Sequence, residues 1–171
     1  MKRAITFCIV LTLLFCSACS SNESRYSNEA ISSLIGVDVS QADIKTIINN
    51  YDGFHGDGAC CISMPFGSDT CLTQIKNNPL WNELPLTDNL TAIVYGIETD
   101  TSSIGPYISF DDFKTPAVPY IENGYYFFED RHYESVNSKD DTDILNRNSF
   151  NLTIAIYDVD TDTLYYLELD T

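Results

Sequence analysis

The segment FNLTIAIYDVDTDTLYYLELDT, residues 150–171, carries the clearest structural pattern in the chain. In its first half, apolar side chains occupy every second position: Phe150, Leu152, Ile154 and Ile156. Its second half repeats this alternation at Tyr165, Leu167 and Leu169. A period of two residues is typical of a strand with one buried face, and Asp and Thr at 158–163 favour a turn. We therefore predict a β-hairpin of two half-buried strands.

Three further strands are predicted before this hairpin. Residues 44–51 and 59–65 flank GFHGDG, residues 53–58, a segment that indicates a turn and hence a second hairpin. Residues 125–129 are an apolar, aromatic run typical of a central strand. Residues 135–149 are polar and predict a surface excursion.

Helices are expected to be few and short, at residues 29–34, 68–77 and 88–95. Asn28 suits the N-cap of the first helix and Gly36 its end. Hairpins combined with short helices indicate an α+β fold, a single domain with a mainly antiparallel sheet and a few short helices packed on one face. A β-sandwich is the alternative fold if residues 88–95 are a strand.

The first 18 residues have the pattern of a secretory signal segment. Lys2 and Arg3 give a positive start, and an apolar run continues to Ala18. A membrane-spanning helix needs about 20 apolar residues, and the polar residues from Ser20 onward end this run too early. We therefore expect residues 1–18 to be removed.

The segment LLFCSACSS, residues 13–21, resembles the lipobox of bacterial lipoproteins, in which a small residue precedes the cysteine that is lipidated. Ala18 and Cys19 fit this pattern, whereas Phe15 is too bulky to precede an acceptor at Cys16. The pattern prefers leucine where Cys16 stands. We expect lipidation at Cys19, which would anchor the chain to the cell membrane on its extracytoplasmic side; secretion after a similar cut is the alternative.

The remaining chain suits a short tether and one folded domain. Residues 19–28 comprise Cys19 and a polar segment predicted to be flexible. Residues 29–171 are long enough to bury the core of a single globular domain.

The chain is strongly acidic, with a net charge of −16. Loss of Lys2 and Arg3 leaves 7 basic side chains against 25 acidic ones, a net charge of about −18. Binding to nucleic acid relies on Lys and Arg, so no nucleic-acid partner is expected. The acidity promotes solubility and leaves room for cations or basic partner proteins.

Three cysteines remain once Cys19 carries lipid: Cys60, Cys61 and Cys71. Neighbours on a strand point to opposite faces, so only one of Cys60 and Cys61 can reach Cys71. Export permits a disulfide, with Cys61 and Cys71 as one pairing. Buried free thiols are the alternative.

Two hypotheses for metal binding follow from the sequence. His55 and Asp57, together with Asp130 and His132, would form a divalent-metal site if the fold brought them together. Alternatively, the glycines around His55 suit a tight turn and Arg131 suits a surface salt bridge.

The second hypothesis is a calcium loop, because three carboxylates are spaced like the first ligands of an EF-hand: Asp158, Asp160 and Asp162. Thr163 stands where that loop needs glycine, and the glutamate falls one residue early. A polar hairpin turn is the favoured alternative.

No catalytic signature is visible: the chain has neither a G-x-S-x-G elbow nor a phosphate-binding glycine loop. We expect no cofactor and lean away from an enzyme. The 11 tyrosines suit a recognition surface, although tyrosines also fill and edge a sheet. The favoured function is a non-enzymatic module that binds a protein or glycan.

Most of the chain after the signal segment resembles a family of uncharacterised small lipoproteins from Gram-positive bacteria. The resemblance is carried by GFHGDG, by LPLT at residues 84–87, by NGYYFFEDRH at residues 123–132 and by the final hairpin. It implies export and a single domain, and it implies no activity or ligand.

Overall fold

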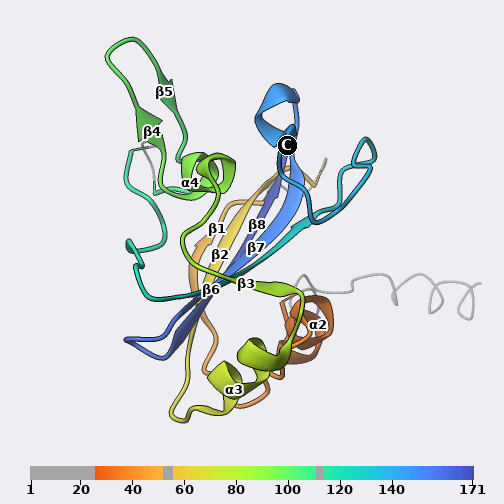
Figure 1. Ribbon diagram of the computed structural model, residues 1–171, viewed down its shortest axis with the longest axis vertical. Coiled ribbons are helices and arrows are strands. Elements are labelled where there is room, and N and C mark those ends of the chain that lie inside the picture. Colours follow the sequence, from red (N-terminus) through yellow and green to blue (C-terminus); the bar gives the residue numbers. More distant parts are fainter. Residues whose placement is uncertain (1–25, 52–55, 111–113) are drawn as a thin grey trace, which may run out of the picture.

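The computed structural model describes residues 26–51, 56–110 and 114–171. Six strands form one sheet in the order β1-β2-β8-β7-β6-β3, and every pairing in it is antiparallel. Three short α-helices pack against this sheet (Figure 1). The predicted α+β fold, one domain with a mainly antiparallel sheet, is confirmed.

The strands of the sheet are β1 (Lys45–Asn49), β2 (Gly58–Pro65), β3 (Trp81–Glu83), β6 (Gly124–Asp130), β7 (Asn151–Asp158) and β8 (Thr163–Asp170). A small separate hairpin consists of β4 (Ile97–Glu98) and β5 (Ser103–Ile104). The helices are α2 (Asn28–Ile35), α3 (Thr70–Asn77), α4 (Asp88–Val94) and the 3-10 turn η2 (Ile144–Asn146).

The predicted final hairpin is present as β7 and β8, with Ile156 opposite Tyr165. It occupies the centre of the sheet, because β2 pairs with β8 and β6 with β7. Both strands are buried on both faces, as the buried Tyr157 and Tyr166 show. The expectation of half-buried strands was therefore wrong, since side chains of either parity lie in a core.

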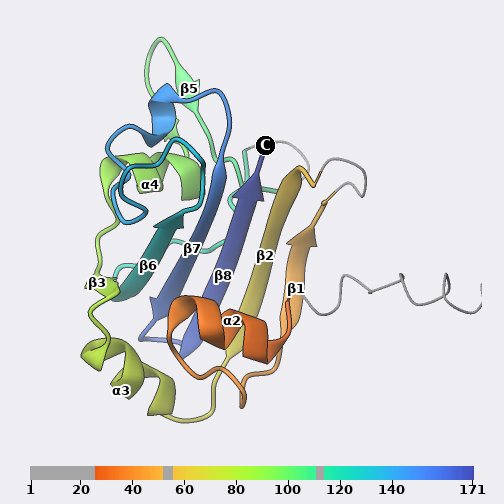
Figure 2. The ribbon, with the colours of Figure 1, turned by 90° about the vertical axis from the view of Figure 1, so that its right-hand side faces the viewer.

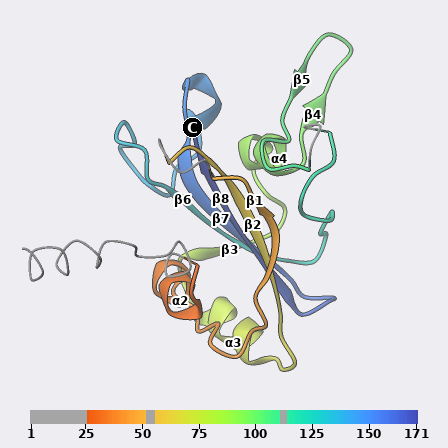
Figure 3. The same cartoon turned by 180° about the vertical axis from the view of Figure 1, so that it is seen from behind.

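Helices cover both faces of the sheet, which corrects the expectation that they pack on one face. Leu90 and Ile93 of α4 pack on the face formed by Ile154 and Leu167. Ile31 of α2 and Ile75 of α3 pack, with other apolar residues, on the opposite face. Figure 1 and Figure 3 show α2 and α3 on one side of the sheet and α4 on the other.

Local contacts explain where the helices begin and end. Ser27, not Asn28, caps α2 by accepting a hydrogen bond from Ala30 N (3.2 Å). Gly36 ends α2 as predicted, with a left-handed φ of 68°. The helix at 88–94 decides against the β-sandwich, and its N-cap is Thr87.

The outer edges of the sheet are interrupted. A bulge between Thr46 and Ile48 disturbs the pairing of edge strand β1 with β2. At the other edge, β3 pairs with only the first part of β6. The chain beyond residue 137 lies along the rest of β6. There Asp130 N donates to Ser138 O (2.8 Å), and Lys139 Nζ donates to Phe128 O (3.1 Å). The edge along β6 thus offers little free backbone to another strand, and the bulge makes the edge along β1 irregular.

Candidate functional site

Several loops meet at the end of the sheet where β7 begins and β8 ends. Figure 2 shows this end beside the C-terminus, away from α2 and α3. A pocket here is lined by Asp57, by His132 and Tyr133, and by Ser149 and Asp170. Three of its nine lining residues, His132, Tyr133 and Ser149, belong to residues 131–149. We call this segment the clamped loop, because ion pairs hold both of its ends.

The guanidinium of Arg131 fixes the start of the clamped loop. Its Nε donates to Asn151 Oδ1 (2.8 Å), and its Nη2 donates to Asp170 Oδ1 (3.0 Å). Its Nη1 bonds Thr153 Oγ1 and lies 3.3 Å from Glu168 Oε1. One planar cation therefore ties the loop to the ends of both central strands.

Tyrosine hydroxyls complete this network beneath the loop. Tyr166 donates to Glu168 Oε1 (2.5 Å), and Tyr51 donates to Asp170 Oδ2 (2.9 Å). Burial, followed by the negative charge of Asp170, raises the pKa of Tyr51. Burial, followed by the charge of Glu168, likewise raises the pKa of Tyr166. Both phenols therefore stay protonated and act as donors.

A second ion pair fixes the end of the clamped loop. Arg147 Nη1 lies 2.5 Å from Asp130 Oδ2, and Asp130 is only 2% exposed. Between the two arginines, the buried Ile144 holds the middle of the loop in the core. The first part of the loop instead exposes 87% of Tyr133 and all of Val136.

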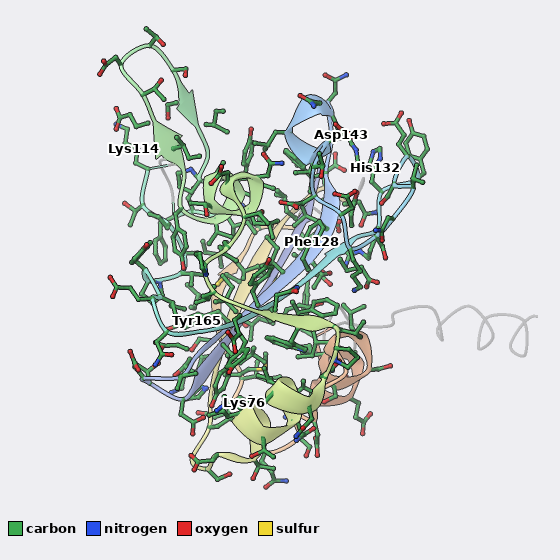
Figure 4. The ribbon with its side chains drawn as sticks, viewed as in Figure 1. Lys76, Lys114, Phe128, His132, Asp143 and Tyr165 are labelled. Atoms are coloured by element: carbon green, nitrogen blue, oxygen red, sulfur yellow. The ribbon has the colours of Figure 1, made fainter. Side chains whose placement is uncertain are left out.

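His132 is engaged on both ring nitrogens. Its Nε2 lies 3.1 Å from Ser149 Oγ, and its Nδ1 accepts from Glu134 N (3.3 Å). The imidazole also packs on the ring of Tyr133, with centroids 4.5 Å apart. These contacts orient the ring within the loop, and Figure 4 shows it at the same end of the molecule as Asp143.

The structure brings together only part of the metal site considered in the sequence. Asp57 and His132 line the same pocket. Asp130, however, turns toward Arg147 and accepts a bond from the backbone N of His132 (3.0 Å). His55 lies outside the described residues. In the parts of the chain that the structure describes, no three His, Cys, Asp or Glu side chains are grouped to hold a metal.

The three carboxylates of the calcium hypothesis have separate local partners. Asp158 accepts from Asp160 N (2.9 Å) and from Thr161 Oγ1 (2.7 Å). Asp160 accepts from the Asn123 side chain (2.7 Å), while Asp162 accepts from the Tyr157 hydroxyl. The group therefore has the geometry of a hydrogen-bonded hairpin turn.

The cysteine pairing Cys61–Cys71 is not formed. Cys61 faces the core under α4, whereas Cys71 lies in the core under α2 and α3, and both are free thiols. Cys60 shares the core of Cys71. Burial raises the pKa of Cys61 and of Cys71 to about 12. Cys19 lies outside the described residues.

The role of the two arginines was missed in the sequence, where Arg131 was taken for a surface salt bridge. A usable signal was present. Glu168 and Asp170 continue the face of β8 that carries Tyr166, and carboxylates on a covered face need a cation. The chain has few cations to supply, and Arg131 is one of them.

Comparison of the chain with protein-family models, curated proteins and solved structures finds no match. Among the residues described, no helix has the length and apolar character needed to cross a bilayer.

Proposed function

We propose that this chain is a membrane-anchored lipoprotein on the extracytoplasmic side of the cell membrane. It binds a protein or glycan through the exposed part of the clamped loop and is not an enzyme. The observation that carries this proposal is the exposure of Tyr133 and Val136 on a loop whose two ends are held by ion pairs, one half-buried and one to the buried Asp130.

The energetics of the ion pairs made by Arg131 and Arg147 indicate that these pairs position the clamped loop. Arg131 and Arg147 form ion pairs with carboxylates that are almost fully buried, including Glu168 at 4% exposure. Desolvation offsets much of the attraction in such pairs, so they are a weak source of stability. They do fix geometry, and a loop that is already ordered loses less entropy when it binds. An exposed tyrosine on such a loop suits recognition.

Charge narrows the class of partner. Arg131, Lys139 and Arg147 are each paired with a carboxylate of the fold. Few cations are left to balance the acidic surface. A surface of this charge favours binding of a basic protein or a neutral glycan and disfavours binding of nucleic acid.

The test is site-specific photo-crosslinking in the organism that makes the protein. A photoreactive phenylalanine replaces Tyr133 in one variant and Tyr120 in a matched control, because Tyr120 is also exposed (73%) but lies outside the clamped loop. We expect a discrete adduct from position 133 and none from position 120. Equal adducts from both positions, or none from 133, would overturn the proposal.

A further inference from the structure

A second pocket lies on the α4 side of the sheet, at the edge where β6 leaves β3. Its polar lining consists of Asn82, Thr87, Tyr126, Lys139 and Asp141. It differs in position from the pocket beside His132. The clamped loop contributes Lys139 and Asp141 to it, but the exposed Tyr133 and Val136 do not line it. All of its residues lie in the described parts of the chain.

Tyr126 is the feature of this pocket that points to a ligand. The residue is only 9% exposed, and among the described residues its hydroxyl has no hydrogen-bond partner. This hydroxyl is not one of the buried atoms that lack a partner, so it opens into the pocket and can bond a ligand there. Asn82 lies directly opposite Tyr126 across the β3–β6 pair, so both side chains project from the same face.

Lys139 and Asp141 bring opposite charges to the same pocket without pairing with each other. Lys139 Nζ donates to Phe128 O (3.1 Å) and lies 3.5 Å from Glu129 Oε1 and 4.0 Å from the centre of the Phe127 ring. An ammonium has three N–H donors, so these two bonds leave one donor available.

Asp141 is held independently of Lys139. One of its carboxylate oxygens accepts from Thr87 Oγ1, and its backbone O accepts from the Asn89 side chain (2.8 Å). Its second carboxylate oxygen is the remaining acceptor. Burial, followed by the negative charge of Asp141, raises the pKa of Tyr126. The hydroxyl therefore stays protonated, and its oxygen can still accept a bond from a ligand ammonium.

The volume and the apolar lining of the pocket limit the size and kind of ligand that it can hold. The volume is about 250 Å³, and pockets for drug-sized ligands begin at about 300 Å³. Leu90 and Phe128 add an apolar wall, and Figure 4 shows Phe128 near the middle of the molecule.

We propose that this pocket binds a free α-amino acid with an apolar side chain. The ligand ammonium lies against Asp141 and the oxygen of Tyr126, and its carboxylate accepts from Lys139 and the Asn82 amide. The ligand side chain packs on Leu90 and Phe128. Two opposite charges that do not pair with each other, each with a hydrogen-bonding position to spare, and a hydroxyl without a partner in the described fold match a zwitterion of this size.

The test is a titration of the full chain, purified in detergent, with leucine, monitored by calorimetry and by the fluorescence of Trp81. This residue is the only tryptophan of the chain and lies between Leu80 and Asn82, which line the pocket. The matched probes are N-acetyl-leucine, which lacks the ammonium, and leucinamide, which lacks the carboxylate. We expect saturable binding of leucine and at least about tenfold weaker binding of each capped probe.

Tyr126→Phe is the most informative variant, because it removes only a hydroxyl that has no partner in the described fold. It should unfold like the unmodified chain and bind leucine about threefold to tenfold more weakly. Asp141→Asn and Lys139→Met should weaken binding further, whereas Tyr120→Phe should leave it unchanged. No saturable binding of leucine, equal binding of the capped probes, or full affinity in Tyr126→Phe would each overturn the proposal.

Discussion

The guanidinium of Arg131 lies 3.0 Å from the carboxylate of Asp170, although 39 positions separate the two residues. Arg131 directly follows β6, and Asp170 is the last residue of β8. Because β7 lies between these strands, the contact spans a central strand and joins the clamped loop to the end of the sheet.

Replacement of Arg131 should therefore destabilise the domain more than a surface change would. We expect Arg131→Met to lower the free energy of unfolding by about 3 kcal/mol, because it removes a cation from Glu168, which is almost fully buried. Urea denaturation followed by circular dichroism measures this change.

Lys45 provides the control for that variant, since its ion pair with Asp43 (3.8 Å) is well exposed on both sides. Lys45→Met should change stability by less than about 1 kcal/mol. Adding Glu168→Gln to Arg131→Met should recover part of the loss. Equal effects of Arg131→Met and Lys45→Met would contradict the buried role of Arg131.

Gly124 is required by close backbone packing. A Cβ at this position would lie 2.0 Å from the carbonyl oxygen of Tyr157 on β7. We expect Gly124→Ala to cost about 3 kcal/mol, because β6 must shift away from β7. Gly67→Ala is the matched control, since a Cβ there meets nothing within 4 Å. A thermal melt that ranks the two variants equally would refute this account.

The buried thiols predict a loss of stability at alkaline pH. Burial raises the pKa of Cys61 and of Cys71 to about 12 in the folded chain, against about 8.5 in an unfolded chain. Between these values the unfolded state releases protons that the folded state keeps. The stabilisation is thus complete below about pH 8.5 and is lost as the pH rises toward 12.

At about pH 10 each thiol should account for a loss of about 2 kcal/mol relative to neutral pH. Cys61→Ala should therefore reduce the difference between urea titrations at the two pH values by that amount. Ile31→Val is the control, because it also removes buried volume but has no proton to release. If Cys61→Ala leaves the pH difference unchanged, burial of this thiol does not control it.

Lipidation can be tested separately from ligand binding. Cys19→Ala should abolish the incorporation of labelled palmitate and release the chain from the membrane fraction, because no thiol remains at the expected acceptor position. Cys16→Ala should keep both the label and the location. Labelling that survives Cys19→Ala but not Cys16→Ala would move the acceptor to Cys16.

The strands and helices were largely accessible from the sequence because their signals are local. The alternation from Phe150 onward predicts the hairpin, and Gly36 predicts the end of the first helix. The position of that hairpin in the sheet depends on contacts with β2 and β6, which lie far away along the chain. The alternation also gave no sign of the core under α2 and α3. Thr153 and Tyr166 are hydrophilic enough to suggest a face in contact with solvent, and yet both are buried.

The candidate sites were less accessible because they depend on which distant side chains meet. Asp57 and His132 do reach one pocket, but nothing local indicates that Asp130 turns to Arg147. In the sequence Tyr126 has the pattern of an ordinary strand residue, and the opening of its hydroxyl into a pocket with Asn82 and Asp141 is evident only from the fold.

The order of the strands has a consequence for how the chain is made. The central strands, β7 and β8, follow the other described strands along the chain. Until they are synthesised, β1 with β2 and β3 with β6 are isolated strand pairs, and such pairs are only marginally stable in water. Folding must wait for residues 151–170, so the nascent chain remains unfolded, the state in which a polypeptide can be threaded through a membrane.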